Sequence, residues 1–538
     1  MRRLLQTAIF RLTIVVGFVA TLLAGGISAP AHAVNSGSKL LISGDNTFYA
    51  YVVGGETINA AFTKSTENEP VGLVKHDISV TLDGPGLQTQ ACTISKDVSV
   101  GQGCSFLNVA APQTGIYRLA FNLPDAAKPY PEVSPTVKWG GNLFSWDMTI
   151  KDGATEKQGR VWSELYAVRQ PIAESFLANL TYHYVSESGA IYRASYKGYN
   201  GQISTFSADA VGIRSGKECQ SSYQSIDVTD EQRSPSFGTC GGSYKLFFEQ
   251  PAGDLPQSAK QWDGKKTDWI SPAVSAPKVS DLRFESDKNG DVQSGKVAFK
   301  LSNFVGQYSI DIDTTGDGSF TAKGDIKVKR TMKKVDNSLQ EFVFDGVDAR
   351  GQVVPSSQPI AIRINVEKVA EIHLVNADVE GRNGGLELVR LSGENAPSGR
   401  MCWNDTDLRP LDNQALQTKV LDGRDCPDST LTALHGWAYA TGSWGDLRYI
   451  DDWAYAATKV EGVSKIQYPE ASEPIIATGT NSKQNVVIAI AGLILFGIFT
   501  TFIVVIIVKR RNKMRMLKQM QQQNFGPPGP GDQRPPSL

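Results

Sequence analysis

Residues 435–455 combine aromatic rings, glycines and carboxylates in one short stretch. Aromatic rings stack on the apolar faces of sugars, and carboxylates accept hydrogen bonds from sugar hydroxyls, so this composition is typical of carbohydrate recognition. The same rings could instead fill a small β-sheet core, because tryptophan is usually buried, and this second interpretation is favoured. The candidate ligand-binding residues are Trp437, Trp444, Asp446, Asp451 and Trp453.

Two acidic stretches, residues 287–291 and 311–325, contain the oxygen ligands and glycine turns that calcium needs. Neither stretch matches an EF-hand loop: with Asp313 at the first position, Gly324 stands where the bidentate glutamate belongs. Asp-Gly and Asn-Gly pairs are also typical of β-turns, and the turn interpretation is favoured. The candidate calcium ligands are Asp287, Asn289, Asp291, Asp313 and Asp317, and no other cofactor is predicted.

Catalytic motifs have little support. The sequence contains no His-Glu-x-x-His, no Gly-x-Ser-x-Gly and no phosphate loop. His183 alternates with two tyrosines in a predicted strand, which indicates a structural role. His435, beside Trp437, is the one histidine that merits a test as a catalytic residue. The primary prediction is therefore a protein that is not an enzyme.

The two ends of the chain predict its topology. Residues 486–508 are an unbroken apolar run, long enough to cross a bilayer as a helix, and the basic residues 509–511 mark its cytoplasmic side. A basic start, a short apolar run and the small-x-small site at 31–33 predict a signal peptide over residues 1–33. We expect a single-pass protein of the cell membrane, with its N-terminal part extracellular and its C-terminus cytoplasmic.

Six cysteines remain in the predicted exported part, and they lie in pairs that are close in sequence. Six cysteines allow about 15 pairings, so spacing alone does not prove the connectivity. A zinc site is the alternative, but no Cys-x-x-Cys spacing and no nearby histidine support it. In an oxidising compartment we expect local disulfides between Cys92 and Cys104, Cys219 and Cys240, and Cys402 and Cys426.

Turn-forming residues are plentiful and helical apolar spacing is scarce, so the predicted fold class is all-β. Strands are predicted over 180–185 and 191–196, joined by a turn at Gly189, and isoleucines alternate strictly at 310–312 and 360–364. The predicted organisation is a signal peptide at 1–33, β-rich modules at 34–137, 138–275, 276–369 and 370–465, a stalk at 466–485, a transmembrane helix at 486–508 and a tail at 509–538.

The segment FDGVDARGQVVP, residues 344–355, carries a family resemblance. It resembles the segment F/W-DGxDxxGxxVP of bacterial Ig-like modules of the flagellar hook-cap type, which recurs in many surface proteins. This resemblance implies an Ig-like β-sandwich at 276–369 and says little about function. The whole pattern resembles bacterial modular cell-surface proteins with a C-terminal anchor, which implies several Ig-like modules in series.

The expected function is therefore adhesion or ligand binding by extracellular β-sandwich modules, with a glycan or a protein as the ligand. The formal net charge of −1 argues against a nucleic-acid partner. One alternative is a membrane-anchored hydrolase of the cell envelope that uses His435 or His183 with nearby carboxylates. Another is a signalling receptor, whose tail at 509–538 is too short for a folded enzyme and would need an unidentified cytosolic partner.

Overall fold

A computed structural model shows an all-β protein with several antiparallel sheets. The described residues are 34–35, 41–42, 47–64, 77–95, 97–99, 101–122, 144–169, 177–201, 203–216, 219–287, 290–366, 369–393, 396–398, 401–408, 434–438, 445–455 and 459–469. The predicted signal peptide, transmembrane helix and tail lie outside them. In the described part of the chain, no helix has the length and apolar character needed to span a bilayer.

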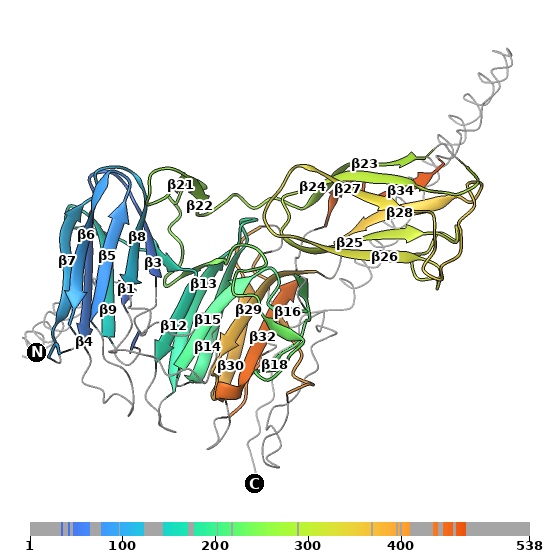
Figure 1. The fold of residues 1–538 in the computed structure, drawn as a ribbon. Coiled ribbons are helices and arrows are strands. Elements are labelled where there is room, and N and C mark those ends of the chain that lie inside the picture. The colour runs from blue at the N-terminus through green and yellow to red at the C-terminus, as the bar shows by residue number, and fades with distance from the viewer. Residues whose placement is uncertain are drawn as a thin grey trace, which may run out of the picture. The chain divides into compact units, whose positions relative to one another are not determined.

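Most of the described strands form what we call the large sandwich, two sheets that share one hydrophobic core (Figure 1). The first sheet contains, in order, β18 (Ile226–Asp227), β32 (Arg448–Tyr455), β29 (Ala370–Ala377), β15 (Ile203–Asp209), β12 (Leu165–Arg169), β2 (Leu41–Ile42), β9 (Phe144–Asp152), β4 (Thr57–Lys64) and β7 (Gly103–Ala110). Beside this path, β1 (Val34–Asn35) and β10 (Thr155–Lys157) pair with β9, and β31 (Met401–Trp403) pairs with β32. The second sheet contains β30 (Gly381–Arg390), β14 (Ile191–Asn200), β13 (Ala178–Val185), β20 (Lys245–Phe247), β11 (Val161–Ser163), β3 (Thr47–Val52), β8 (Gly115–Asn122), β5 (Ile78–Gly84) and β6 (Leu87–Ile94).

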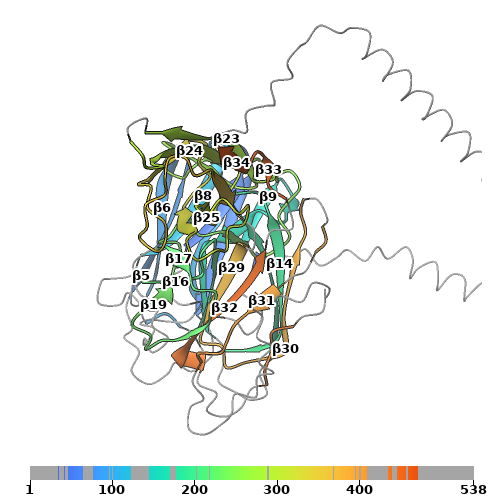
Figure 2. The same cartoon turned by 90° about the vertical axis from the view of Figure 1, so that its right-hand side faces the viewer.

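These two sheets run across the module boundaries expected from the sequence. β29 pairs with β15 in one layer (Figure 1), and β30 pairs with β14 in the other (Figure 2). β2 pairs with β12, which joins the first expected module to the second. The described strands at 34–122, 144–209 and 370–455 therefore contribute to two continuous sheets and do not form separate sandwiches in series. Apolar alternation reveals a strand but not its neighbour, so the sequence could not show this pairing.

The remaining long strands form what we call the small sandwich, with its own hydrophobic core. As predicted, the isoleucines at 310–312 and 360–364 are buried. They lie in β25 (Gly306–Asp313) and β28 (Ile360–Asn365), where Ile310 pairs with Ile364 and Ile312 pairs with Ile362. Its last two strands come from residues 461–468, so the expected stalk begins inside a strand. One sheet is β27 (Leu339–Phe344), β24 (Gly295–Ser302), β23 (Lys278–Ser286) and β33 (Glu461–Gly462), and the other is β26 (Ile326–Met332), β25 (Gly306–Asp313), β28 (Ile360–Asn365) and β34 (Lys465–Tyr468).

The segment at 344–355 forms a tight loop in the small sandwich. The carboxylate of Asp348 accepts hydrogen bonds from the backbone N–H groups of Arg350 and Gln352, at 2.9 and 2.8 Å. Gly351 has φ of 79°, a conformation that side chains disfavour. The aspartate and the glycine are thus required by the loop geometry, which gives this motif a structural explanation.

Smaller elements complete the fold. The predicted hairpin is confirmed as β13 and β14, with Gly189 at φ of 86° in its turn. The other elements are a three-stranded sheet of β17 (Gln220–Ser221), β16 (Ile213–Ser215) and β19 (Arg233–Pro235), a hairpin of β21 (Ser258–Lys260) and β22 (Thr267–Trp269), and the 3-10 helix η3 (Gly445–Leu447).

Two of the predicted disulfides are present. Cys92 in β6 is bonded to Cys104 in β7, so this bond links the final strands of the two sheets of the large sandwich. Cys219 is bonded to Cys240 and closes a segment that packs beside β29 and β32. The third predicted pair, Cys402 with Cys426, includes a residue outside the described part of the chain.

Candidate functional site

Four charged side chains form a continuous buried network in the large sandwich. The two ring nitrogens of His435 contact Asp452 and Asp405, with Nδ1 to Oδ1 at 2.5 Å and Nε2 to Oδ2 at 2.8 Å. The other carboxylate oxygen of Asp452 accepts a hydrogen bond from Nη1 of Arg382 at 2.8 Å. None of the four residues is more than 3% exposed.

Three segments position this network. Successive residues of β32 face opposite sides of its sheet, so Asp452 points into the core while Asp451 points away from it. Residues 434–438 pair with β30, where Leu386 donates a backbone hydrogen bond to His435 at 2.9 Å. Gly436 permits this close approach, because a Cβ there would lie 2.6 Å from the carbonyl oxygen of Arg382. The ring of Trp403 stacks on His435 at 4.6 Å.

The charges of the network stabilise one another. Burial alone would lower the pKa of His435, but the carboxylates of Asp452 and Asp405 outweigh burial and raise it. Burial alone would raise the pKa of Asp452, but Arg382 and His435 outweigh burial and lower it. The pKa of Asp405 is lowered against burial mainly by His435. These shifts all favour the state with two cations and two anions, in which the network has no net charge.

This arrangement does not favour general-base catalysis by His435. A general base needs a free nitrogen lone pair within reach of the proton that it takes. Both ring nitrogens of His435 are directed at carboxylates and, in the protonated ring, both are donors. His183, the other histidine of the hydrolase alternative, lies in β13, and burial lowers its pKa to about 4. The network therefore has the character of a structural element.

The raised pKa of His435 predicts a pH-dependent stability. A group whose pKa is higher in the folded chain contributes its full stabilisation below the ordinary value of 6.5, and this is lost as pH rises through the folded-state pKa. We expect the stability difference between the wild type and His435→Gln to be largest near pH 5–6 and to shrink at alkaline pH. Urea unfolding of both proteins across this range measures it; a difference independent of pH would contradict the charged network.

The aromatic candidates lie inside the protein. Trp437, Asp451 and Trp453 are 8%, 0% and 1% exposed, respectively. Asp451 accepts a hydrogen bond from His373 Nδ1 at 2.9 Å, and Trp453 packs edge-on against Tyr223 at 5.3 Å. These three side chains are buried as core residues are and present no ring face to a sugar. Trp444 and the side chain of Asp446 lie outside the described part of the structure.

One of the two acidic stretches gathers its carboxylates. Oxygen atoms of Asp313, Asp317 and Asp325 lie within 4.8 Å of one another. Asp313 also accepts backbone hydrogen bonds from Gly316 at 2.7 Å and Gly318 at 2.8 Å, as in a turn held by an aspartate. Burial raises the pKa of Asp325, and the negative charge of Asp313 adds to the rise.

The first acidic stretch does not join this group. Asp287 and Asp291 are exposed, and the carboxylate of Asp287 accepts a hydrogen bond from the hydroxyl of Ser294 at 3.1 Å. Asn289 lies outside the described residues. Of the two acidic stretches, only the loop that follows β25 therefore remains a candidate calcium site.

The turn interpretation of this loop predicts the effect of Asp313→Ala. The substitution leaves several backbone N–H groups without their acceptor, so we expect the small sandwich to lose about 1–3 kcal/mol of stability. Thermal unfolding of the wild type and the variant, in a chelator and in millimolar calcium, measures this loss. A loss that occurs in calcium but disappears in the chelator would instead assign the carboxylates to a metal.

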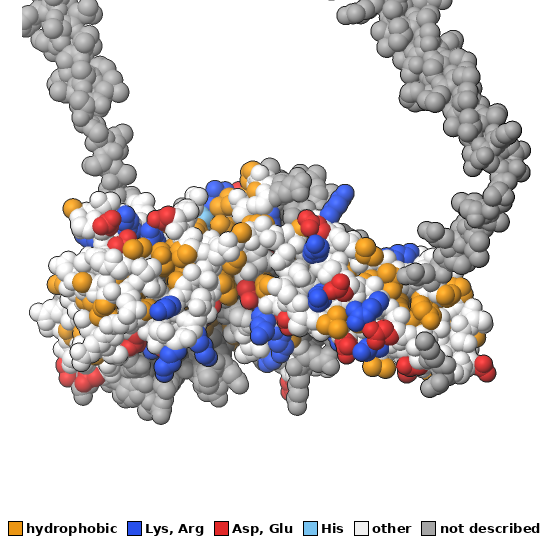
Figure 3. All heavy atoms as spheres, turned by 90° about the horizontal axis from the view of Figure 1, so that it is seen from above, with side chains coloured by type: hydrophobic (Ala, Val, Ile, Leu, Met, Phe, Trp, Pro, Cys, Tyr) orange, Lys and Arg blue, Asp and Glu red, His pale blue; other side chains and the backbone are white. Residues whose placement is uncertain are grey.

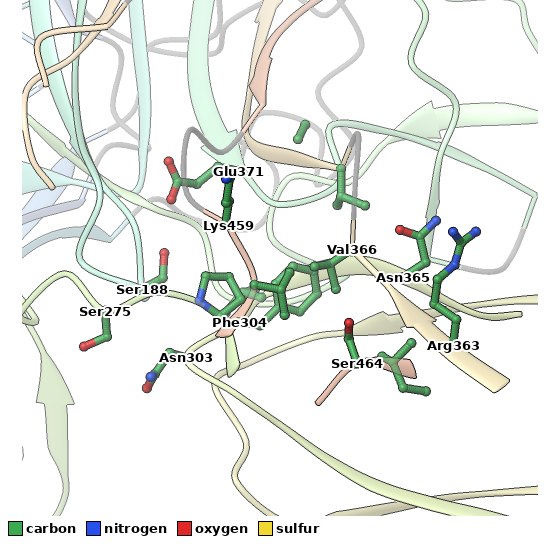
Figure 4. Close-up of a pocket in the computed structure, with 16 residues that line it drawn as sticks. Ser188, Ser275, Asn303, Phe304, Arg363, Asn365, Val366, Glu371, Lys459 and Ser464 are labelled. Atoms are coloured by element: carbon green, nitrogen blue, oxygen red, sulfur yellow. The ribbon is translucent and has the colours of Figure 1, made fainter. Parts of the chain in front are cut away.

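A pocket of about 460 Å³ lies where the chain passes between the small and large sandwiches. Phe304 and Val366 lie at its centre, Glu371 and Lys459 at one end, and Asn365 at the other (Figure 4). Its volume is within the range of small-molecule sites. Polar and charged residues make up half of its lining, and apolar residues make up the other half.

The comparisons with known proteins give no family: no family model matches the chain, and no curated protein matches it. The class of the protein therefore comes from the fold alone, which is all-β with several antiparallel sheets.

Sequence reasoning missed Arg382, Asp405 and His373. One signal could have found Arg382, because it shares the two-residue alternation of Leu386 and Leu388, which point into the core. No comparable signal indicated Asp405, which approaches His435 only through the fold.

Proposed function

We propose that the chain is a single-pass membrane protein whose β-sandwich part lies outside the cell and binds a glycan or a protein there. The proposed location in the membrane rests on the apolar run at 486–508, the basic residues that follow it and the cleavage pattern at 31–33. The disulfides Cys92–Cys104 and Cys219–Cys240 support it, because such bonds persist in oxidising compartments. The small sandwich, which contains the hook-cap-like segment, is proposed to be Ig-like.

The pocket of about 460 Å³ carries the binding part of the proposal. Its apolar centre offers contact area, while Asn303, Glu371 and Lys459 offer hydrogen-bonding groups around it. Glu371 is held in position, because its carboxylate accepts hydrogen bonds from Tyr192 at 2.5 Å and Arg390 at 2.8 Å. A charged group that is already oriented loses less entropy when a ligand binds.

The surface charge supports a ligand other than nucleic acid. Basic and acidic side chains are intermixed on the face shown in Figure 3, and the formal net charge is −1. Proteins that bind nucleic acid present a continuous basic patch or stripe.

A glycan array probed with the full chain in detergent tests this function. We expect selective binding that is lost in Val366→Trp, because the larger side chain fills the pocket. Val463→Trp is the matched control, since Val463 is 60% exposed and does not line the pocket. Equal binding by both variants would exclude the pocket as the site. A blank array would move the proposal to a protein ligand, which crosslinking of the full chain at the cell surface would identify.

A further inference from the structure

A second pocket, of about 300 Å³, is lined by the small sandwich and by Tyr223 of the segment closed by Cys219–Cys240. It shares Asn365 and Val369 with the first pocket, so the two are neighbours. We propose that this second pocket binds the oxyanion group of an acidic saccharide. The inference rests on the proposed function, because it names the chemical class of the extracellular ligand.

The positive charge of the second pocket is the first argument for an anion site. Its lining includes the two lysines Lys327 and Lys329 of the edge strand β26, and no acidic residue. Both lysines are exposed, and within the described residues neither forms an ion pair. The nearest carboxylate by strand register is that of Asp311, opposite Lys327; its Oδ2 is paired with Arg363 at 2.7 Å, and its Oδ1 has no hydrogen-bond partner among the described residues. Two ammonium groups therefore line the pocket, and the one carboxylate beside them already neutralises Arg363.

A buried hydrogen-bond donor without a partner is the second argument for an anion site. Gln307 lies in β25 and is 8% exposed, yet its amide nitrogen Nε2 has no hydrogen-bond partner among the described residues. Leaving a buried amide donor unsatisfied costs about 1–3 kcal/mol. Gln307 lines the same pocket as the two lysines. The Nε2 atom is enclosed in this structure, so an oxyanion in the pocket would accept its hydrogen bond once the Gln307 side chain turns toward the two ammonium groups.

The strained backbone of Tyr223 is the third argument for a ligand site here. This residue has φ of 53°, a conformation that is a rare outlier for a bulky side chain. The Tyr223 hydroxyl accepts a hydrogen bond from the backbone N–H of Ala370 at 3.1 Å, and its ring packs against Trp453. Strained backbone that the surroundings hold in place is concentrated at ligand sites. The Tyr223 ring also packs against His373 and Tyr455, so only the part of the ring that lines the pocket can contact the apolar face of a sugar.

Titration of the full chain in detergent with glucuronate, glucose and inorganic phosphate tests the inference. We expect glucuronate to bind, glucose not to bind, and phosphate to bind more weakly than glucuronate. Raising the salt concentration should weaken glucuronate binding, because ionic contacts are screened. Phosphate binding as tight as that of glucuronate would overturn the saccharide part, and no glucuronate binding would overturn the inference.

Two double variants locate the site. Lys327→Met with Lys329→Met is expected to weaken glucuronate binding by about tenfold or more, because charge-assisted contacts are lost. Lys296→Met with Lys300→Met is the control, since it removes the same charge from two partly exposed, ion-paired lysines on the other sheet of the small sandwich. Equal weakening in both would show a non-specific charge effect and overturn the inference.

The two proposals fail in different ways. Selective array binding that survives Lys327→Met with Lys329→Met would leave the proposed function standing and overturn the second pocket. Glucuronate binding that depends on these lysines, together with a blank array, would support the second pocket and count against a larger glycan as the ligand.

Discussion

Arg382→Met is expected to lower the free energy of unfolding of the large sandwich by about 3–5 kcal/mol, because it leaves the buried network with two carboxylates and only His435 as a cation. Arg382 and Asp452 are both fully buried, and their contact is 2.8 Å. The guanidinium group also lies 4.8 Å from the centre of the Trp437 ring, so the substitution removes a second favourable contact. Chemical denaturation followed by tryptophan fluorescence measures the loss.

Lys197→Met is the matched control for Arg382→Met. Lys197 in β14 pairs with Glu387 in β30 at 2.9 Å, but its side chain is 48% exposed. We expect a change of about 0–1 kcal/mol for this exposed pair. Equal effects of the two substitutions would show that water reaches the Arg382–Asp452 pair, which would contradict its description as buried.

Trp453→Ala is expected to destabilise the large sandwich by about 3–5 kcal/mol, because it opens a large cavity. Trp453 is 1% exposed and packs against Tyr223 and the buried Cys402. The sugar-recognition interpretation predicts a different result, namely loss of glycan binding with unchanged stability. Thermal unfolding and glycan binding, measured on the same protein, separate the two.

Trp262→Ala is the matched control for Trp453→Ala. Trp262 is only partly buried and contacts Tyr49 and Arg118 near the surface. It should lose less stability than Trp453→Ala, since less apolar surface becomes exposed. If Trp453→Ala were as mild as this control, its side chain would have to lie at the surface and the sugar-recognition interpretation would return.

The buried network has a consequence for the fold. An ion network of this kind is weak evidence for added stability, because desolvation offsets much of the charge attraction. It does, however, require that residues 434–438, β30 and β32 meet in one register. A slip of one residue in β32 would place Asp451 in the core instead of Asp452. We therefore infer that the network fixes the register of β32. This structural role agrees with the engagement of both His435 ring nitrogens by carboxylates, which leaves neither of them free to act as a general base.

Local patterns were sufficient for some parts of the fold. The isoleucine alternation predicted β25 and β28, the turn at Gly189 predicted the hairpin, and cysteine spacing predicted two disulfides. These predictions succeeded because each depends on residues that are close in sequence.

Other features depend on contacts between distant parts of the chain. The pairing of β15 with β29 and the approach of Asp405 to His435 leave no local periodic signal. Tryptophans among carboxylates suited a sugar site or a core equally in the sequence, and only their burial distinguishes the two. The pocket residues Gln307 and Tyr223 were likewise not separable from ordinary strand and loop residues.

Protease treatment of intact cells that express the full chain with a C-terminal tag tests the central claim, that the β-sandwich part works outside the membrane. The account predicts that added protease removes this part and leaves a small tagged fragment containing residues 486–538 with the cells. Protection of the full-length chain in intact cells, with digestion only after lysis, would contradict it.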